Sequence, residues 1–257
     1  MSSYFTFPPL AVQKRRFPPH ACGVDRPYCG QTAKRPLMYT LHYFPDTASL
    51  AIRMVLAELG VPHNSRQIDR AAGELNSPKY RALHPMGKIP AMETPDGPMF
   101  ETAAILLYLC DRHQALAPTL KSAERAAFLK WLFFTSTNIH PTVMQLFYPE
   151  RTAGEAHVDA VMAHASAHMH SLLTLLNDMV AADAPKWLST EPSLLGYYIG
   201  MLMRWLASVP PDHPGYFPSS RYRALHHILL ALEARPAALA IAEDEGLGAT
   251  VFTNPQI

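Results

Sequence analysis

The sequence predicts a small α/β domain followed by an all-α domain, and three observations lead to this fold class. The chain has 257 residues, of which 49% are hydrophobic and 17% charged, enough apolar material for one or two globular domains with their own cores. Between residues 38 and 113, short apolar runs alternate with a helical pattern, which predicts strands and helices in turn. Residues 121–250 carry helical patterns throughout, so we expect an all-helical domain there.

The α/β domain is expected to begin with a strand and a helix. The alternation in MYTLHYF predicts the strand, which Pro45 and Asp46 end. The stretch TASLAIRMVLAELG repeats apolar residues at helical spacing, and Gly60 stands where a helix is commonly closed. A second short strand, PHNSRQID, and a polar loop containing Gly73 and Pro78 follow.

A hairpin and a second helix should complete this domain. The runs KIPAMET and PMF are separated by the turn residues 95–97, Pro-Asp-Gly, which predicts a β-hairpin. Residues 101–113, ETAAILLYLCDRH, predict a helix with Ala104, Leu107 and Tyr108 at helical spacing. The order of elements is therefore β-α-β-β-β-α.

The remaining chain is expected to form helices only. Residues 121–147 predict a long helix that Pro141 should kink or end, because proline lacks the backbone N–H that a helix interior needs. Further helical patterns cover residues 155–182, 193–207, 221–233 and 236–243. Residues 193–207 are almost wholly apolar, so we expect a buried central helix with Ser193 as its cap.

Composition excludes several classes of function. A formal charge of +1 and a pI near 7.8 give no electrostatic basis for binding nucleic acid or an acidic substrate. No apolar run approaches the roughly 20 residues that a membrane-spanning helix needs. Three cysteines are too few for a disulfide scaffold, so we expect a reducing compartment and a cytoplasmic location.

Residues 1–37 form a separate segment, basic and rich in proline. They contain six Lys and Arg against one Asp, a charge of +5, and six prolines, with no strand or helical period. Such a segment cannot bury enough apolar surface to order itself, so we expect a disordered leader. It is either a basic tether or an appendage upstream of a start at Met38. Cys22 and Cys29 are separated by six residues, which fits no common metal-ligand spacing.

Two stretches, HPMGKIPAMET and FETAAILLYL, carry a family resemblance by their order and spacing. With the helical region behind them, they resemble the cytosolic glutathione transferases, whose first domain is thioredoxin-like. The resemblance runs from about Tyr39 to Leu247, and WLFFTSTNIHPTVMQLFYP is similar to bacterial members in particular. It implies glutathione as co-substrate with no cofactor, a small hydrophobic electrophile as second substrate, and a homodimer.

The resemblance also implies a glutathione site. In the family, the proline matching Pro90 is cis, and the residue matching Ile89 offers backbone N–H and C=O groups to the cysteinyl part of the tripeptide. Thr102 and the helix N-terminus would bind the γ-glutamyl carboxylate, and Glu101 its ammonium group. Lys88 would meet the glycyl carboxylate. The alternative is that Glu101 and Thr102 only cap the helix and Lys88 is solvated, but the Ile89-Pro90 register favours the site.

The residue that activates the thiol is expected in the loop after the first strand. Ala48 occupies the position of the catalytic cysteine of bacterial members, and Asp46 that of the serine of other members, where its charge would repel a thiolate. Ser49 and Thr47 remain as hydroxyl donors, with Ser49 expected first and Thr47 close behind. For each of these two residues, helix capping is the alternative role.

Two further residues are candidates for the site by resemblance. Tyr43 matches a tyrosine of bacterial members, although an aromatic residue packed in the core is the simpler interpretation. His140, in STNIHPTV, corresponds to a histidine that bacterial relatives direct toward the thiol, where it would act as a donor or a partial cation. Its alternative is a satisfied histidine at the Pro141 kink.

No metal site is expected. His164 and His168 stand at i, i+4 and could chelate an ion, but His157 lies on the order of 10 Å away along the helix axis. No acid completes an HExxH pattern. Cys110 lies near an apolar helix face, so we interpret it as a core residue.

Taken together, these features predict a glutathione transferase that conjugates the glutathione thiolate to small apolar electrophiles. Phe147, Tyr148 and the loop after the first strand are expected to line the cleft for the electrophile, in a role such as detoxification. Two alternatives stay open: a non-catalytic protein that binds glutathione or a hydrophobic ligand, and glutathione-dependent reduction of peroxides or disulfides.

Overall fold

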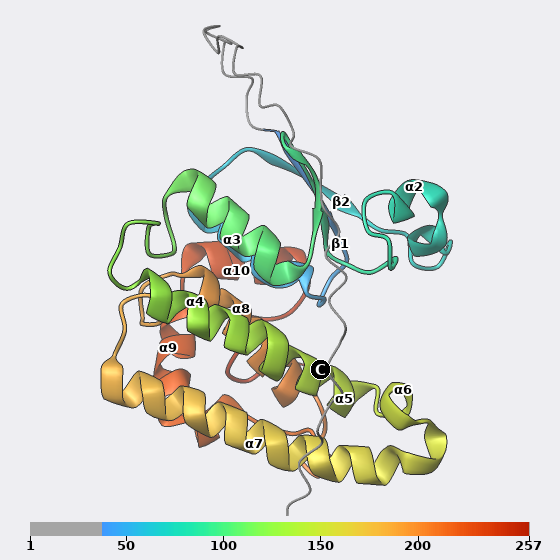
Figure 1. Ribbon diagram of the computed structural model, residues 1–257, viewed down its shortest axis with the longest axis vertical. Helices are drawn as coiled ribbons and strands as arrows, with labels where there is room; N and C mark the ends of the chain where they lie inside the picture. The colour runs from blue at the N-terminus through green and yellow to red at the C-terminus, as the bar shows by residue number, and fades with distance from the viewer. Residues whose placement is uncertain (1–37, 257) are drawn as a thin grey trace, which may run out of the picture. The chain divides into compact units, whose positions relative to one another are not determined.

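The four predicted strands form one mixed sheet in the computed structural model, which describes residues 38–256 (Figure 1). The strands lie in the order β2-β1-β3-β4. Strand β1 (Tyr39–Tyr43) pairs in parallel with β2 (His63–Gln67) and antiparallel with β3 (Ala91–Thr94), which forms a hairpin with β4 (Gly97–Phe100). Because β1 and β2 run in parallel, the loops that follow them leave the sheet at the same edge.

Helices α1 (Ser49–Leu59) and α3 (Thr102–His113) lie on one side of this sheet (Figure 1). Helix α1 contacts α3 and two helices of the all-α part, and all of its residues from Ser49 to Leu56 are buried. It ends at Gly60, whose φ of 61° is the left-handed conformation that glycine adopts without strain, as predicted.

The buried side of α3 differs from the one that the sequence indicated. Residues Ile105, Leu106 and Leu109 are buried, whereas Ala104 is exposed and Tyr108 only half-buried. The Tyr108 hydroxyl instead donates a hydrogen bond to the Asp96 carboxylate, 2.6 Å away in the hairpin turn. The predicted helical spacing was thus correct. The stripe that faces the core, however, is that of Ile105, Leu106 and Leu109 rather than the neighbouring stripe of Ala104 and Tyr108.

The segment between β2 and β3 contains more structure than the predicted polar loop. A single 3₁₀ turn (Glu74–Asn76) precedes α2 (Pro78–Arg81). The Ser77 hydroxyl caps α2 by accepting the Tyr80 N–H at 3.1 Å, and proline in the first turn is preorganised for a helix. A cap followed by proline is a local signal for this short helix that the prediction missed.

The rest of the described chain is helical, as predicted. Its helices are α4 (Arg125–Phe134), α5 (His140–Phe147), α6 (Glu150–Ala153), α7 (Val158–Asp183), α8 (Leu194–Ala207), α9 (Arg223–Glu233) and α10 (Pro236–Asp244), with short 3₁₀ turns at Glu155–His157 and Ser219–Arg221. The predicted thioredoxin-like domain followed by a helical part is therefore the observed fold.

Pro141 interrupts the first long helix, as expected. A π-helical turn (Thr135–Ile139) separates α4 from α5, and Pro141 lies in the first turn of α5. A proline at this point has no N–H for the preceding turn, and the wider turn accommodates it. His140, one of the predicted site residues, is held at this junction.

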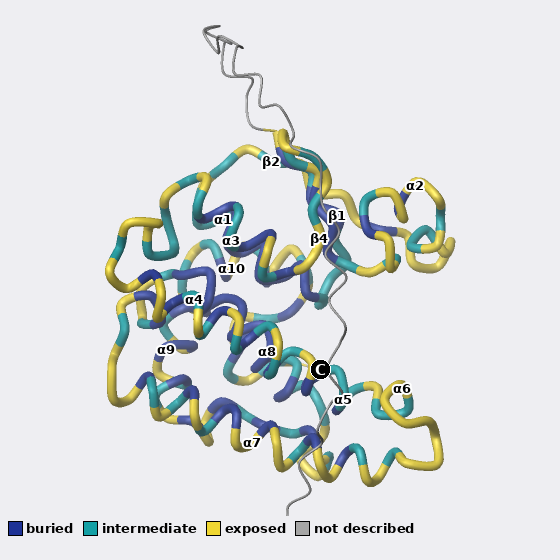
Figure 2. Tube along the Cα trace, viewed as in Figure 1, coloured by how far each residue is buried: buried dark blue, intermediate teal, exposed yellow. Residues whose placement is uncertain are grey.

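Helix α8 is the central helix of the core (Figure 2). All of its residues except Trp205 are buried, and the Ser193 hydroxyl caps it by accepting the Gly196 N–H at 3.0 Å. One charged residue, Arg204, is buried within it at 2% exposure. A buried guanidinium needs a partner, and Arg204 has one in the Asp46 carboxylate.

The predicted leader and the search for membrane-spanning helices concern different parts of the chain. The predicted leader, residues 1–37, with Cys22 and Cys29, lies outside the described residues. Between residues 38 and 256, no single helix is long and apolar enough to cross a membrane. Helices α9 and α10 have the required length and composition only when they are taken together, and the angle between them is 77°.

Candidate functional site

The loop before β3 carries three of the predicted site residues. The Ile89-Pro90 peptide bond is cis, as the resemblance implied. The Tyr80 hydroxyl donates to the Lys88 carbonyl oxygen at 2.7 Å, and Tyr80 itself is buried. The Lys88 side chain is exposed. The Tyr80 hydroxyl of α2 therefore fixes the backbone of this loop, while the Lys88 ammonium group is available to a ligand.

The start of α3 has an unusual backbone conformation. Glu101, the residue before the helix, has a φ of 72° and a ψ of 115°. A non-glycine residue in such a region costs on the order of 1–3 kcal/mol, and such residues cluster at functional sites. The Glu101 side chain is exposed, and neither it nor the Thr102 hydroxyl has a hydrogen-bond or ion-pair partner among residues 38–256. Glu101 occupies the N-cap position of α3, but its side chain makes no capping hydrogen bond to the helix.

The two charged candidates, Lys88 and Glu101, lie near the same histidine. Burial lowers the pKa of His84, the negative charge of Glu101 opposes this shift, and the positive charge of Lys88 adds to it. His84 is 4% exposed, and its Nδ1 atom has no partner within the part of the chain that the structure describes. The charges of Glu101 and Lys88 thus both act on the same buried imidazole.

His140 joins this group from the helical part of the chain. Burial, with a smaller contribution from the positive charge of Lys88, lowers the pKa of His140 to about 4. His140 is therefore neutral near pH 7, which corrects the expectation of a partial cation. Its Nδ1 atom lies 2.8 Å from the Tyr198 hydroxyl. Because Tyr198 is buried and has no other acceptor among residues 38–256, we assign the proton of this bond to Tyr198, which leaves an N–H on Nε2 of His140.

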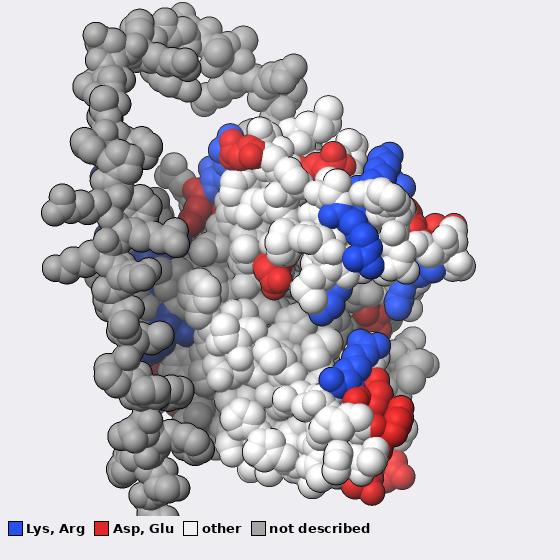
Figure 3. All heavy atoms as spheres, turned by 45° about the vertical axis from the view of Figure 1, so that its right-hand side comes forward, with Lys and Arg blue, Asp and Glu red and all other residues white. Residues whose placement is uncertain are grey.

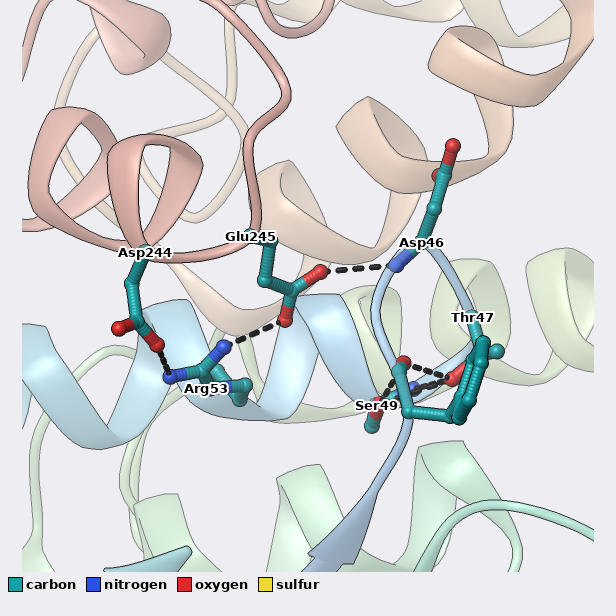
Figure 4. A network of polar contacts seen from close by, with 7 residues as sticks. Asp46, Thr47, Ser49, Arg53, Asp244 and Glu245 are labelled. Atoms are coloured by element: carbon teal, nitrogen blue, oxygen red, sulfur yellow. Dashed lines mark hydrogen bonds and ion pairs between the residues drawn. The ribbon is translucent and has the colours of Figure 1, made fainter. Parts of the chain in front are cut away.

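The hydroxyls of Thr47 and Ser49 are engaged in the turn before α1 (Figure 4). They lie 2.8 Å from each other, and the Phe44 carbonyl oxygen accepts from Thr47 at 2.8 Å and from Ser49 at 3.1 Å. Ser49 is fully buried, whereas Thr47 is half-buried. Ala48 occupies the capping position of α1 and has no side chain that can cap it. Of the two candidate hydroxyls, only that of Thr47 is within reach of a ligand in this arrangement.

Asp46 does not act on this turn as a free negative charge. Its carboxylate accepts two hydrogen bonds from Arg204, each 2.9 Å long, and one from the Trp205 indole N–H at 3.1 Å. Its own N–H donates to the Glu245 carboxylate at 2.8 Å. Figure 4 shows the Asp46 carboxylate pointing away from Thr47. Contrary to the expectation that it repels a thiolate, Asp46 is neutralised from helix α8.

Tyr43 packs as a strand aromatic. Its ring lies under the Arg53 guanidinium, 4.3 Å from the ring centroid, and contacts the main core. Arg53 in turn pairs with Glu245, at 2.8 Å, and with Asp244 (Figure 4). These contacts do not assign the Tyr43 hydroxyl to the site.

The sequence did not indicate the residues that hold the turn, or a groove beside it. Arg204 and Glu245 are more than 150 positions from Asp46, although an arginine inside the apolar run of α8 was a signal that a partner must exist. A groove of about 510 Å³ opens next to the turn and is lined by Phe44, Gln67, Ile68, Asp69, Arg70 and Ala71. The Arg70 guanidinium covers the Phe44 ring at 4.9 Å, so this groove carries a cation.

The other candidates do not gather into a site. His164 and His168 stack on the exposed side of α7, with ring centroids 6.1 Å apart. Residues 38–256 contain no group of three or more His, Cys, Asp or Glu side chains arranged for a metal ion. Cys110 is buried, and burial raises the pKa of its thiol, so it is a core residue.

Comparison with known proteins finds similarity to the glutathione S-transferases. Residues 48–112 match the family model described as "Glutathione S-transferase, N-terminal domain". The chain is 33% identical over 108 residues to glutathione S-transferase F10 of Arabidopsis thaliana, a match that covers 40% of this chain and 50% of the relative. In this part of the chain, the sequence is therefore similar to the glutathione S-transferases. It is also 34% identical over 115 residues to glutathione S-transferase GstA of Escherichia coli O157:H7, covering 43% and 57% of the two chains.

The solved structures extend the likeness over both parts of the fold. The structure of a sphingomonad glutathione S-transferase complexed with glutathione has a TM-score of 0.67 and 26% identity, covering 81% of this chain and 100% of that chain. The sequence match to the first curated relatives spans only about half of their length. The family model, by contrast, matches only residues 48–112, which lie within the thioredoxin-like part of the fold.

Proposed function

We propose that this protein is a glutathione transferase that binds glutathione at the start of α3 and conjugates its thiolate to a small apolar electrophile. The observation that carries the proposal is Glu101. It is held at a φ of 72° beside the cis Ile89-Pro90 bond, with no partner for its carboxylate among the described residues. A strained, exposed and unpaired acid at a helix start is arranged for a ligand with an ammonium group.

Glutathione fits the groups that converge there. Its γ-glutamyl carboxylate would accept from the Thr102 hydroxyl and the free N–H groups at the α3 N-terminus, with its ammonium on Glu101. Its cysteinyl backbone would pair with the N–H and C=O of Ile89, in the manner of a strand added to a sheet edge. Its glycyl carboxylate would meet Lys88. A related structure that contains glutathione supports this ligand.

The thiol would be activated by neutral donors. A free thiol has a pKa near 8.5, so only a few per cent is thiolate at pH 7. The donors would be the Nε2–H of His140 and the Thr47 hydroxyl, which would turn its proton from the Phe44 carbonyl to the thiolate while Ser49 stays bonded to that carbonyl. Each donor is worth about 1–3 kcal/mol, and one pKa unit corresponds to about 1.4 kcal/mol, so we expect the bound thiol pKa to fall by about one or two units.

The electrophile would bind beside this thiol, between the turn before α1 and the end of α5. Phe147 is half-buried and Tyr148 is 39% exposed, so both offer apolar surface. Figure 3 shows one face of the molecule with few charged side chains over much of its area. We extend the proposal to a cytoplasmic homodimer with a role in detoxification.

The test is turnover with a generic aromatic halide, measured beside glutathione affinity. The full chain should bind glutathione, consume the halide in a glutathione-dependent reaction and lose both properties together when Glu101 is changed to alanine. The His140→Phe variant should bind glutathione normally but turn over more slowly. Absence of glutathione binding by the parent protein would refute the proposal.

A second function, glutathione or hydrophobic-ligand binding without catalysis, is favoured by one observation. Ala48 replaces a reactive cysteine, and both neighbouring hydroxyls are engaged within the turn. A protein of this kind would bind glutathione with no lowered thiol pKa and no turnover. Reduction through a mixed disulfide is less well supported, because Cys110, the one cysteine within residues 38–256, is buried.

A further inference from the structure

The turn that carries Thr47 is held from outside the thioredoxin-like domain. Asp46 directly precedes Thr47 and has a φ of 52°, a left-handed conformation that costs a residue other than glycine about 1 kcal/mol or more. The side chain of Asp46 is bound by Arg204 and Trp205 of α8, and its N–H by Glu245, just after α10. All three partners of the turn thus belong to the helical part of the chain.

Arg204 and Asp46 require each other. The Arg204 side chain is 3% exposed, and a guanidinium at this depth is stable only when it is paired and hydrogen-bonded. Two of its nitrogens bind the Asp46 carboxylate, and the third donates to the Val251 carbonyl oxygen at 3.3 Å. The position of Asp46 is therefore set by helix α8 and the C-terminal segment.

Glu245 fixes the other side of the turn. Its side chain is 1% exposed and divides its two oxygens between the Asp46 N–H and the Arg53 guanidinium, both at 2.8 Å. Arg53 lies on α1, about one turn after the start of that helix. Glu245 consequently sets how the turn meets α1, which is also the geometry that brings the hydroxyls of Thr47 and Ser49 to the Phe44 carbonyl.

We propose that Asp46, Arg204, Trp205 and Glu245 form a clamp by which the helical part positions the Thr47 hydroxyl toward the glutathione thiol. The inference rests on the proposed function, since it assigns a role in thiol activation. The four are positioning residues, because they act through Thr47 and touch neither substrate. The clamp also explains how an aspartate is tolerated beside a thiolate: its charge is bound to Arg204 and turned away from Thr47.

The opposite end of α1 supplies a matched control. There Glu58 accepts from the Tyr197 hydroxyl at 2.6 Å and from Arg235 at 2.5 and 3.0 Å. Glu58 and Glu245 are both nearly buried carboxylates that join α1 to the helical part through an arginine. Glu58 lies roughly 14 Å along the helix axis from its start, so it cannot act on Thr47 directly.

The experiment compares Glu245→Gln with Glu58→Gln in the full chain. For each we measure the urea midpoint, kcat and KM for glutathione with an aromatic halide, and the ultraviolet titration of the bound thiol. Glutamine retains the size of glutamate, but its amide NH₂ group cannot accept a hydrogen bond. In Glu245→Gln, either the Asp46 N–H or the Arg53 guanidinium therefore loses its acceptor. We expect Glu245→Gln to lower kcat by about five- to tenfold and to raise the bound thiol pKa, with KM for glutathione within about twofold. Glu58→Gln should lower the urea midpoint but leave kcat and the thiol pKa unchanged.

A double-mutant cycle separates positioning from general destabilisation. If the clamp acts through Thr47, then Glu245→Gln should have no further effect on kcat or thiol pKa in a Thr47→Ala background. Equal kcat losses in Glu245→Gln and Glu58→Gln, or additive losses with Thr47→Ala, overturn the clamp while leaving the proposed function intact. Failure of the parent protein to bind glutathione overturns both, so the two failures are distinguishable.

Discussion

The starts of helices α1 and α3 share one strained feature and differ in what holds it. Each is preceded by an acidic residue with a positive φ, Asp46 at 52° and Glu101 at 72°. Asp46 is bound by Arg204, Trp205 and Glu245. Glu101 has no side-chain partner in the described part of the chain.

This difference separates a structural turn at α1 from the proposed binding site at α3. At α1, interactions within the protein offset the strain and fix a turn that carries hydroxyl donors. At α3, no such compensation is present among residues 38–256, so the stabilising partner is expected to be a ligand. Changing each acid separately tests whether the two helix starts differ in this way.

The largest effect is expected from removing the Asp46 carboxylate. Asp46→Ala leaves Arg204 buried without its counter-ion, and breaking a buried pair in this way costs about 3–5 kcal/mol. Urea unfolding of the full chain measures the loss. Asp46→Gly removes the same carboxylate but accepts the positive φ, so its loss should be smaller by about 1 kcal/mol. A loss below about 1 kcal/mol in Asp46→Ala would show that Arg204 does not depend on this partner.

Acid sensitivity is the next largest effect, and it arises at His140, the first residue of α5. The folded-state pKa of His140 is about 4, below the ordinary value of 6.5, so its contribution to stability is present above about pH 6.5 and is lost as pH falls toward 4. At about 1.4 kcal/mol per pKa unit, the parent should lose about 2 kcal/mol at pH 5 on account of His140.

The control for this effect is His140→Gln, which cannot titrate. His84 and His113 also have lowered pKa values through burial, so the prediction concerns the difference between parent and variant. Urea unfolding at pH 7.5 and pH 5 should show the stability gap between the two proteins narrowing by about 2 kcal/mol. A gap that does not change with pH would mean that His140 is not held neutral by the fold.

The smallest effect is expected from relieving the strain at Glu101. Glu101→Gly should unfold at higher urea than Glu101→Ala by about 1 kcal/mol, because glycine adopts a positive φ without cost whereas alanine does not. Both variants lack the carboxylate, so charge is held constant. Equal stability of the two would indicate that the Glu101 backbone is not strained.

The elements of the fold could be predicted because their signals are local. The alternation in β1, the glycine that closes α1 and the proline between α4 and α5 each act within a few residues. The buried side of α3 was missed because two neighbouring apolar stripes differ little in sequence, and packing decides between them. The short helix α2 was missed, although Ser77 followed by Pro78 is a local sequence signal for the start of a helix.

The candidate site was predictable only in part. Lys88, Ile89, Pro90, Glu101 and Thr102 were found through the family resemblance, and their roles remain proposals. The pairing of Asp46 with Arg204 spans 158 positions and depends on tertiary structure, so no local pattern reveals it. The neutral state of His140 likewise follows from burial, which no spacing rule supplies.

The most direct test of the central claim is the affinity of glutathione for the parent and for Glu101→Gln, measured by calorimetry at pH 7.5. Glutamine preserves the size and the backbone of Glu101 but removes its charge, so the loss reports the ammonium contact alone. Glu93→Gln is the control, since that carboxylate lies on β3 and is bound to His42. We predict that Glu101→Gln weakens binding by about 1.5–3 kcal/mol, roughly 10- to 150-fold, and that Glu93→Gln binds as the parent does. Unchanged affinity in Glu101→Gln would contradict the claim that the start of α3 is the open site for glutathione.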